Sequence, residues 1–198
     1  MPKLLVATHN QGKVQEYAEM LTDFAGQWVG LDEIDIGWDV AETGRTFAEN
    51  AILKATTYAR ESGLLTLADD SGLEVDALDG QPGVYTARFG GPDLTPVQRY
   101  QYLLALLADT PDDLRGARFK CVIALASPDA LLGTTTGVCP GQIAQAPAGD
   151  GGFGYDPVFF LPEHGLTMAE LPPGVKHQIS HRGRALRKMA PLLATAIR

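Results

Sequence analysis

Apolar and polar positions in the first sixty residues follow the pattern of a buried strand and two amphipathic helices. The apolar run at 3–8 predicts the strand, and apolar residues at helical spacing over 13–24 predict the first helix. Thr46 and Glu49 have the spacing of a capping box, and an apolar stripe continues to Ala59, so we expect a second helix there. A strand that leads directly into a helix favours an α/β fold.

The rest of the chain alternates further strands with loops and helices. Short apolar runs and period-two alternation predict strands at 64–68, 73–78, 117–126 and 131–139. The first two would be joined by the tight turn Asp69-Asp70-Ser71-Gly72. Pro96 opens a third helix, and a basic turn and helix cover 176–189. Because no repeat or linker interrupts this pattern, we expect one α/β domain over residues 1–198.

The composition is that of a globular protein with an acidic surface. Apolar residues make up 45% and charged residues 20% of the 198 positions, and the formal net charge is −8. This balance argues against disorder. It also argues against wrapping DNA or RNA, whose phosphates attract a basic face, so we expect no nucleic acid polymer as partner. A small anionic ligand remains open, because it needs only a local group of cations or a metal.

The cysteines and the N-terminal residues indicate the compartment. Cys121 and Cys139 form no CxxC pair and have no histidine at zinc spacing, so we expect reduced thiols. Residues 1–8 lack the apolar stretch of a signal peptide, and no later run approaches the ~20 apolar residues of a membrane span. We therefore expect a cytoplasmic protein with no membrane partner.

The turn after the first strand carries the sequence Thr8-His9-Asn10-Gln11-Gly12-Lys13. It is not a P-loop, because Ala7 replaces the first glycine and Val14 replaces the serine or threonine that would hold magnesium. The free amides and positive dipole of a helix start, together with Lys13, still predict an anion site. An ordinary strand-to-helix turn with a surface lysine is the alternative.

Carboxylates occur where a metal ion is plausible. Asp69 and Asp70 are adjacent, and Glu42 precedes the second helix. Magnesium is held by one or two carboxylates while substrate phosphates supply further ligands, and a carboxylate beside a bound water can accept its proton. The alternatives are turn aspartates that bond their own backbone and, for Lys54, a surface lysine at the edge of the apolar stripe.

Two later segments suggest a nucleobase site. Glycines surround Phe153 in the stretch 151–157, which would leave the ring face open for stacking on a base, and Asp156 could accept from a base-edge N–H. Lys176 and the pair His181-Arg182 are donors for a base carbonyl or a phosphate. The alternatives are a core phenylalanine in a glycine turn and a solvated basic helix.

Six stretches in this chain together resemble the inosine triphosphate pyrophosphatase family. They are THNQGK at 8–13, TFAENAILKA at 46–55, ADDSGLEVDALDGQPGVYTAR at 68–88, GGFGYDPVFF at 151–160, TMAEL at 167–171 and SHRGRAL at 180–186. They stand in family order and span nearly the whole chain. His9 departs from the family, which often has a small residue there, and Thr86 replaces a common serine.

The resemblance implies a fold and a reaction. The fold would be α/β, with a long mixed β-sheet flanked by helices and two lobes around a deep central cleft. The protein would be a homodimer that hydrolyses ITP, dITP or XTP to the monophosphate and pyrophosphate with Mg²⁺. Two other functions remain open, namely a related pyrophosphatase for modified pyrimidine nucleotides and a nucleotide sensor without turnover.

The resemblance also assigns roles to residues of this chain. The triphosphate would be held by Thr8, Asn10, Lys13 and Lys54. Asp70 would be the general base or would organise the metal, with Glu42 and Asp69 as further magnesium ligands. Phe153 would stack on the base, and its edge would be surrounded by Asp156, Lys176, His181 and Arg182. Ser71, Gly154 and Tyr155 would also bind the substrate.

Overall fold

The computed structural model describes residues 3–22 and 26–197, which form two compact units. Unit 1 comprises residues 1–70, 121–137 and 182–198, and unit 2 comprises 71–120 and 138–181. The described strands form one sheet in the order β2-β1-β3-β4-β5-β6-β7. Their bounds are β1 Lys3–Val6, β2 Gln27–Gly30, β3 Leu65–Val75, β4 Gly116–Ala126, β5 Leu131–Ile143, β6 Phe159–Leu161 and β7 Leu166–Thr167.

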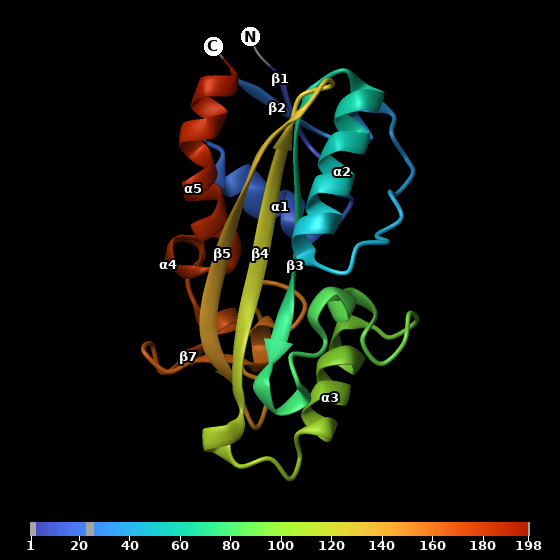
Figure 1. The fold of residues 1–198 in the computed structure, drawn as a ribbon. Coiled ribbons are helices and arrows are strands. Elements are labelled where there is room, and N and C mark those ends of the chain that lie inside the picture. Colours follow the sequence, from blue (N-terminus) through green and yellow to red (C-terminus); the bar gives the residue numbers. More distant parts are fainter. Residues whose placement is uncertain (1–2, 23–25, 198) are drawn as a thin grey trace. The chain divides into compact units, whose positions relative to one another are not determined.

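The sheet is mixed and is accompanied by five described α-helices, which confirms the expected α/β fold (Figure 1). β1 pairs in parallel with β2 and β3, whereas β6 pairs antiparallel with β5 and β7. The helices are α1 Gln11–Met20, α2 Phe47–Ser62, α3 Pro96–Leu106, α4 Pro173–Ile179 and α5 His181–Ala196. None of the described helices is both long and apolar enough to cross a membrane.

Helix starts follow the expected capping signals with two differences. Asn10 caps α1, so this helix begins at Gln11 rather than at 13, and it ends at Met20; residues 23 and 24 of the expected helix lie outside the described ranges. Thr46 caps α2 by accepting from the Glu49 amide at 3.1 Å. The Glu49 carboxylate bonds the Arg45 amide instead of the Thr46 amide, so the expected capping box is only half formed.

The turn expected at 69–72 is absent from the described β3, which runs unbroken from Leu65 to Val75. β1 pairs with Leu65, Thr66 and Leu67 of β3, and β4 is the other hydrogen-bonded neighbour of β3. Incorporation of the polar stretch into this sheet overrides its turn composition. Successive side chains of a strand point to opposite faces of the sheet. Asp69 and Asp70 are therefore directed to different faces, where a turn would have placed them together.

The sheet of unit 1 has helices on both faces. Figure 1 shows α5 in red and α2 in teal on opposite sides of the strands. On the α5 face, α1 and α5 pack on the strands through a buried cluster of Leu4, Val6, Tyr17, Leu21, Leu67, Cys121, Ile123, Leu125, Ala185, Leu186, Met189 and Leu193. Leu67 belongs to this cluster, so Asp69, two residues on, lies on the same face, and Asp70 lies on the α2 face.

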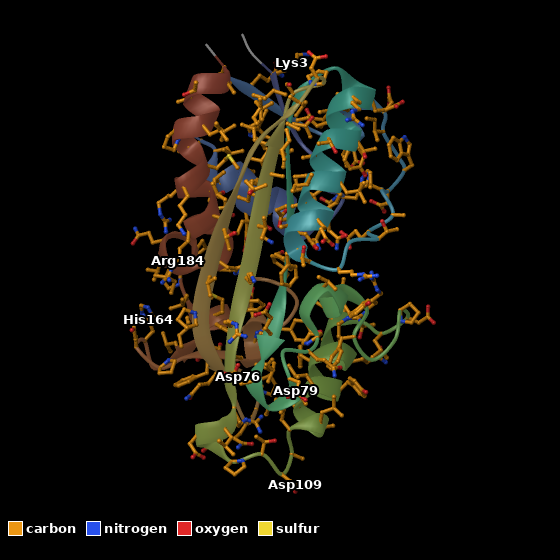
Figure 2. All side chains as sticks on the ribbon, in the orientation of Figure 1. Lys3, Asp76, Asp79, Asp109, His164 and Arg184 are labelled. Carbon is orange, nitrogen blue, oxygen red and sulfur yellow. The ribbon has the colours of Figure 1, made fainter. Side chains whose placement is uncertain are left out.

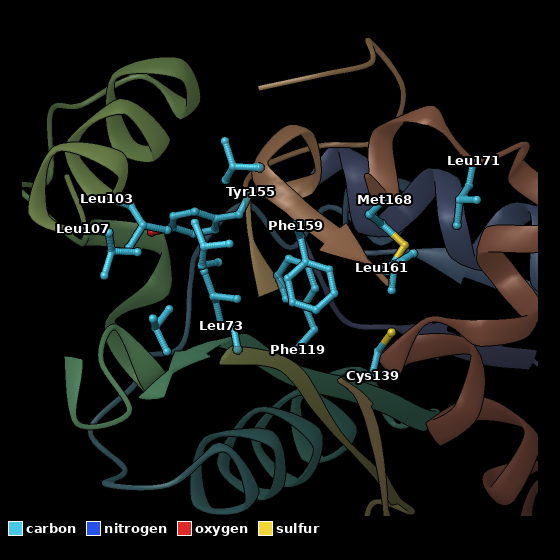
Figure 3. Close-up of a cluster of buried hydrophobic side chains, with 14 residues drawn as sticks. Leu73, Leu103, Leu107, Phe119, Cys139, Tyr155, Phe159, Leu161, Met168 and Leu171 are labelled. Atoms are coloured by element: carbon cyan, nitrogen blue, oxygen red, sulfur yellow. The ribbon is translucent and has the colours of Figure 1, made fainter. Parts of the chain in front are cut away.

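Unit 2 has its own hydrophobic core (Figure 3). Its centre is the ring pair of Phe119 and Phe159, whose centroids are 4.4 Å apart. Leu73 and Leu103 contribute from β3 and α3. Figure 2 shows the labelled, exposed Asp76 at the end of β3, beyond this core. Both cysteines are buried, and neither forms a disulfide.

Candidate functional site

The phosphate loop expected after β1 is built around the N-terminus of α1. The Asn10 side chain accepts from the Lys13 amide at 3.1 Å, and the Asn10 amide donates to Thr8 Oγ1 at 3.2 Å. Three of the four predicted phosphate ligands thus form one turn at a helix start. Amide donors and the helix dipole make such a turn attractive to an anion.

Lys13 extends from this loop to Asp69 on β3. Its Nζ lies 2.9 Å from Asp69 Oδ2, and Arg182 of α5 donates to the same oxygen at 3.2 Å. The Asp69 carboxylate is fully buried. Although burial alone would raise it, the neighbouring Lys13 and Arg182 hold the pKa of Asp69 far below its ordinary value. Asp69 is therefore an internal anion that fixes the lysine of the phosphate loop.

Arg182 belongs to unit 1 and is almost fully buried there. Besides Asp69, it donates to the Glu16 carboxylate of α1. Two of its partners are thus carboxylates, one on α1 and one on β3. The expected role of Arg182 at the base edge stays a prediction.

On the other face of β3, Asp70 meets Asn50 and Lys54 of α2. Asn50 Nδ2 donates to Asp70 Oδ2 at 3.0 Å, and Lys54 Nζ lies 3.8 Å from Asp70 Oδ1. Burial raises the pKa of the Asp70 carboxyl, although Lys54 opposes this shift. Asp70 is therefore a more basic carboxylate than an exposed aspartate, as a proton acceptor requires.

Glu42 completes this cluster. Lys54 Nζ donates to Glu42 Oε1 at 2.7 Å while it also faces Asp70. Although burial alone would lower it, Asp70 and Glu42 raise the pKa of Lys54. The Lys54 ammonium thus lies between the carboxylates of Glu42 and Asp70. A divalent cation would be favoured in the same position.

The donor set fits magnesium better than a metal that requires an all-protein site. No group of three or more His, Cys, Asp or Glu side chains with metal-binding geometry occurs in the described residues. Glu42 and Asp70 offer hard oxygen ligands from two elements, and Mg²⁺ accepts one or two carboxylates plus water and phosphate oxygens. Asp69 lies with Lys13 and Arg182 and is not grouped with these two.

The base-site residues of unit 2 form a compact turn. Asp156 Oδ2 accepts from the Phe153 amide at 2.9 Å and from Lys176 Nζ at 2.7 Å. Lys176 Nζ also lies 5.3 Å from the centroid of the Phe153 ring. Gly152 has a φ of +72°, and a Cβ there would collide with the Asp156 carboxylate. The turn therefore fixes the position of the expected stacking ring.

The remaining candidates contribute in different ways. Tyr155 is buried, and its hydroxyl donates to the Thr86 carbonyl at 2.9 Å, so it anchors the turn to residues 83–88. The His181 ring stacks on Phe119 with centroids 4.8 Å apart. Gly154 has a φ of +64°, and Ser71 follows Asp70 in β3, half-buried. Their expected contacts with substrate stay predictions.

Sequence reasoning missed two residues of these clusters, Asn50 and Glu16. Asn50 stands four residues before Lys54 within TFAENAILKA, and this helical spacing was the available signal. Glu16 had no comparable signal, because its partner Arg182 is distant in sequence.

His9 lies in the phosphate loop after β1, with Nδ1 3.3 Å from Asp32 Oδ1.

Comparisons with known proteins agree over the whole chain. A profile of the Ham1 family matches residues 4–192. A dITP/XTP pyrophosphatase of Desulforamulus reducens is 50% identical over 191 residues, covering 96% of this chain and 95% of the relative. One of Escherichia coli strain K12 is 49% identical over 199 residues, covering 98% of each chain. The solved structure of a HAM1 protein from Coxiella burnetii has a TM-score of 0.88 at 42% identity, covering 98% of this chain and 100% of that one.

Proposed function

Because the chain belongs to the Ham1 family, we propose that it hydrolyses deaminated purine nucleoside triphosphates, namely ITP, dITP and XTP. The products are the nucleoside monophosphate and pyrophosphate, which removes the deaminated nucleotide from the triphosphate pool. The observation that carries the chemistry is Asp70, a buried carboxylate held by Asn50 beside the Lys54–Glu42 pair. Relatives about 50% identical carry the name dITP/XTP pyrophosphatase, which supports the substrate class.

The phosphates are assigned to unit 1. Thr8, Asn10 and Lys13 present short polar groups, amides and an ammonium at the start of α1. Asp69 holds Lys13 from beneath, so the lysine is pre-oriented for a phosphate and loses less conformational freedom on binding. Lys54 supplies a second cation from α2.

Magnesium is part of the proposal. Glu42 and Asp70 would hold it, and bound Mg²⁺ would neutralise phosphate charge during cleavage of the α–β anhydride. Asp70 accepts the proton of the attacking water. Lys54 stabilises the negative charge on the departing pyrophosphate.

The base is assigned to unit 2, where Phe153 provides the stacking face. Deamination replaces an amine donor by a carbonyl acceptor. Donors from Lys176 and His181 therefore favour the 6-oxo group, because adenine would leave a buried donor unpaired at a cost of about 1–3 kcal/mol. GTP shares the 6-oxo group, so its rejection depends on the 2-amino position.

The proposal extends to assembly and location. We expect a homodimer in the cytoplasm, in line with two buried cysteines that form no disulfide. The net charge of −8 supports a small nucleotide rather than a nucleic acid polymer as the partner.

The test is a product analysis of ITP hydrolysis by ³¹P NMR. Wild-type protein with Mg²⁺ is expected to give IMP and pyrophosphate, and Asp70→Asn is expected to be at least about a hundredfold slower, because it lacks the proton acceptor. Orthophosphate as the sole phosphate product would contradict the reaction. Binding of ITP without turnover would instead indicate a nucleotide sensor, and faster turnover of UTP than of ITP would indicate a pyrimidine enzyme.

A further inference from the structure

Three polar side chains of α2 lie four residues apart and hold the segment that carries Glu42. The pairs are Asn50 Oδ1 with the Gly44 amide at 2.8 Å, Lys54 Nζ with Glu42 Oε1 at 2.7 Å, and the Tyr58 hydroxyl with the Val40 amide at 3.2 Å. Residues four apart stand above one another on a helix. The segment is thus fixed on both sides of Glu42 along one stripe of α2.

Asn50 differs from the other two because it uses both ends of its amide. Its oxygen accepts from Gly44, two residues after Glu42, and its NH₂ group donates to Asp70 Oδ2 at 3.0 Å. The residue is 1% exposed, so water cannot replace either partner in the folded protein. One buried side chain therefore joins the Glu42 segment to the carboxylate of β3.

We propose that Asn50 is a positioning residue that sets the spacing of Glu42 and Asp70 for the divalent cation of the proposed function. The hydrogen bond from the Asn50 side-chain amide to Oδ2 fixes the rotation of the Asp70 carboxylate. Oδ1 is thereby directed toward Lys54 and Glu42. The bond from Gly44 fixes the backbone from which Glu42 extends. This inference rests on the proposed function and deepens it, because Asn50 itself touches neither metal nor substrate.

A substitution at Gly44 offers a second, independent way to break the hydrogen bond between Asn50 and the Glu42 segment. A Cβ added at Gly44 would lie 2.5 Å from Asn50 Oδ1 and 2.7 Å from Glu49 Cβ, so Gly44→Ala must push the segment away from α2. Gly37, in the same irregular stretch, has nothing within 4 Å of an added Cβ. Gly37→Ala is therefore the matched control for a glycine-to-alanine change.

The experiment measures metal affinity in two ways for wild type, Asn50→Ala, Gly44→Ala and Gly37→Ala. Free Mn²⁺, a hard cation that accepts the same oxygen ligands, is counted by electron paramagnetic resonance during titration of the protein without nucleotide. The Mg²⁺ concentration at half-maximal ITP hydrolysis is measured separately, together with the KM for ITP at saturating Mg²⁺.

Loss of an outer partner of a metal ligand typically weakens metal affinity about 10- to 100-fold. We expect this increase in the Mn²⁺ dissociation constant and in the half-saturating Mg²⁺ concentration for Asn50→Ala and Gly44→Ala, with KM for ITP within about twofold. Gly37→Ala should match wild type. The double variant Gly44→Ala/Asn50→Ala should be no worse than the more affected single variant, because both break one link.

Unchanged metal dependence in folded Asn50→Ala and Gly44→Ala would overturn the inference while leaving the proposed function intact. A merely structural role would lower the free energy of unfolding in urea without moving the Mn²⁺ dissociation constant, and that result would also overturn it. If Asn50→Ala does not fold, Gly44→Ala decides. Wild type that releases no pyrophosphate would overturn the proposed function itself.

Discussion

Asp69 and Asp70 are adjacent in sequence but have opposite electrostatic surroundings. Asp69 is paired with Lys13 and Arg182 on one face of β3, and these cations lower its pKa despite burial. Asp70 lies on the other face, where burial raises its pKa. The first carboxylate is therefore stabilised as an anion by the fold, whereas the second is costly to ionise and available for chemistry.

The two aspartates should have opposite effects on stability. Asp69→Asn removes a charged partner shared by the buried Arg182 and the half-buried Lys13, and should lower the free energy of unfolding by about 3–5 kcal/mol at pH 7. Asp70→Asn should raise it at pH 8, because a carboxyl whose folded pKa is raised costs stability once it ionises. Urea unfolding of the metal-free protein measures both.

The pH dependence of the free energy of unfolding supplies the control for Asp69→Asn and Asp70→Asn. The contribution of Asp69 is fully present above its unfolded pKa near 4, so the loss in Asp69→Asn should be constant from pH 5 to pH 8. The gain in Asp70→Asn should shrink as the pH falls through the raised folded pKa toward 4. A stability gain in Asp69→Asn, or a loss in Asp70→Asn that grows with pH, would contradict this account.

At the residue scale, the sequence could predict contacts between residues that are close together along the chain. Asn10 and Lys13 are three residues apart in one strand-to-helix turn, and this turn was predicted from the sequence, although the cap at Asn10 was not. The link from Asn50 to Asp70 joins a helix to a strand twenty residues later, and that from Glu16 to Arg182 joins two helices. Such pairs form only when separate elements pack together, and a local sequence pattern does not reveal which elements will pack.

At the scale of elements, the turn at 151–156 requires glycine where its side chains converge. Gly152→Ala should displace Asp156 and Lys176, and with them Phe153, since the added Cβ would overlap the Asp156 carboxylate. We expect KM for ITP to rise about tenfold, from weakened stacking of roughly 1–3 kcal/mol. Steady-state kinetics at saturating Mg²⁺ measure this effect.

Gly165→Ala is the control that distinguishes the steric clash at Gly152 from the backbone strain of an alanine at positive φ. Gly165 has a φ of +65°, similar to the +72° of Gly152, but nothing lies within 4 Å of an added Cβ. Its variant should keep the wild-type KM even if it lowers stability. An equal rise of KM in both variants would show that the clash at the turn is not the cause.

Element prediction succeeded where periodicity was clear and failed in β3. The strand at 117–126 was found from alternation and 131–139 was predicted as a strand, and α3 begins at Pro96 as expected. The polar run 69–72 has the composition of a turn, yet it is extended as part of β3 within the sheet. Neighbouring strands are not visible in a local window, and β2 was missed for the same reason.

At the scale of the whole molecule, the two units have distinct cores and distinct sets of candidate residues. Unit 1 holds the cations and carboxylates assigned to phosphate and metal, and unit 2 holds the turn assigned to the base. The fold class and both sets were predicted from sequence motifs. The expected cleft and homodimer stay predictions.

Removal of divalent cations should abolish turnover without unfolding the protein. Chelation with EDTA is expected to lower ITP hydrolysis at least about a hundredfold, because phosphate charge is then unscreened at Glu42 and Asp70. Circular dichroism should remain unchanged, since the Lys54 ammonium already neutralises these carboxylates. Full turnover in EDTA would exclude the proposed metal role.

The most direct test of the central claim is kcat/KM for pyrophosphate release from dITP, XTP, dATP and dGTP with Mg²⁺. We predict that dITP and XTP exceed dATP by about tenfold to a hundredfold or more, because adenine leaves a buried donor unpaired. dGTP should also be slow. Equal values for all four nucleotides would contradict the assignment to deaminated purines.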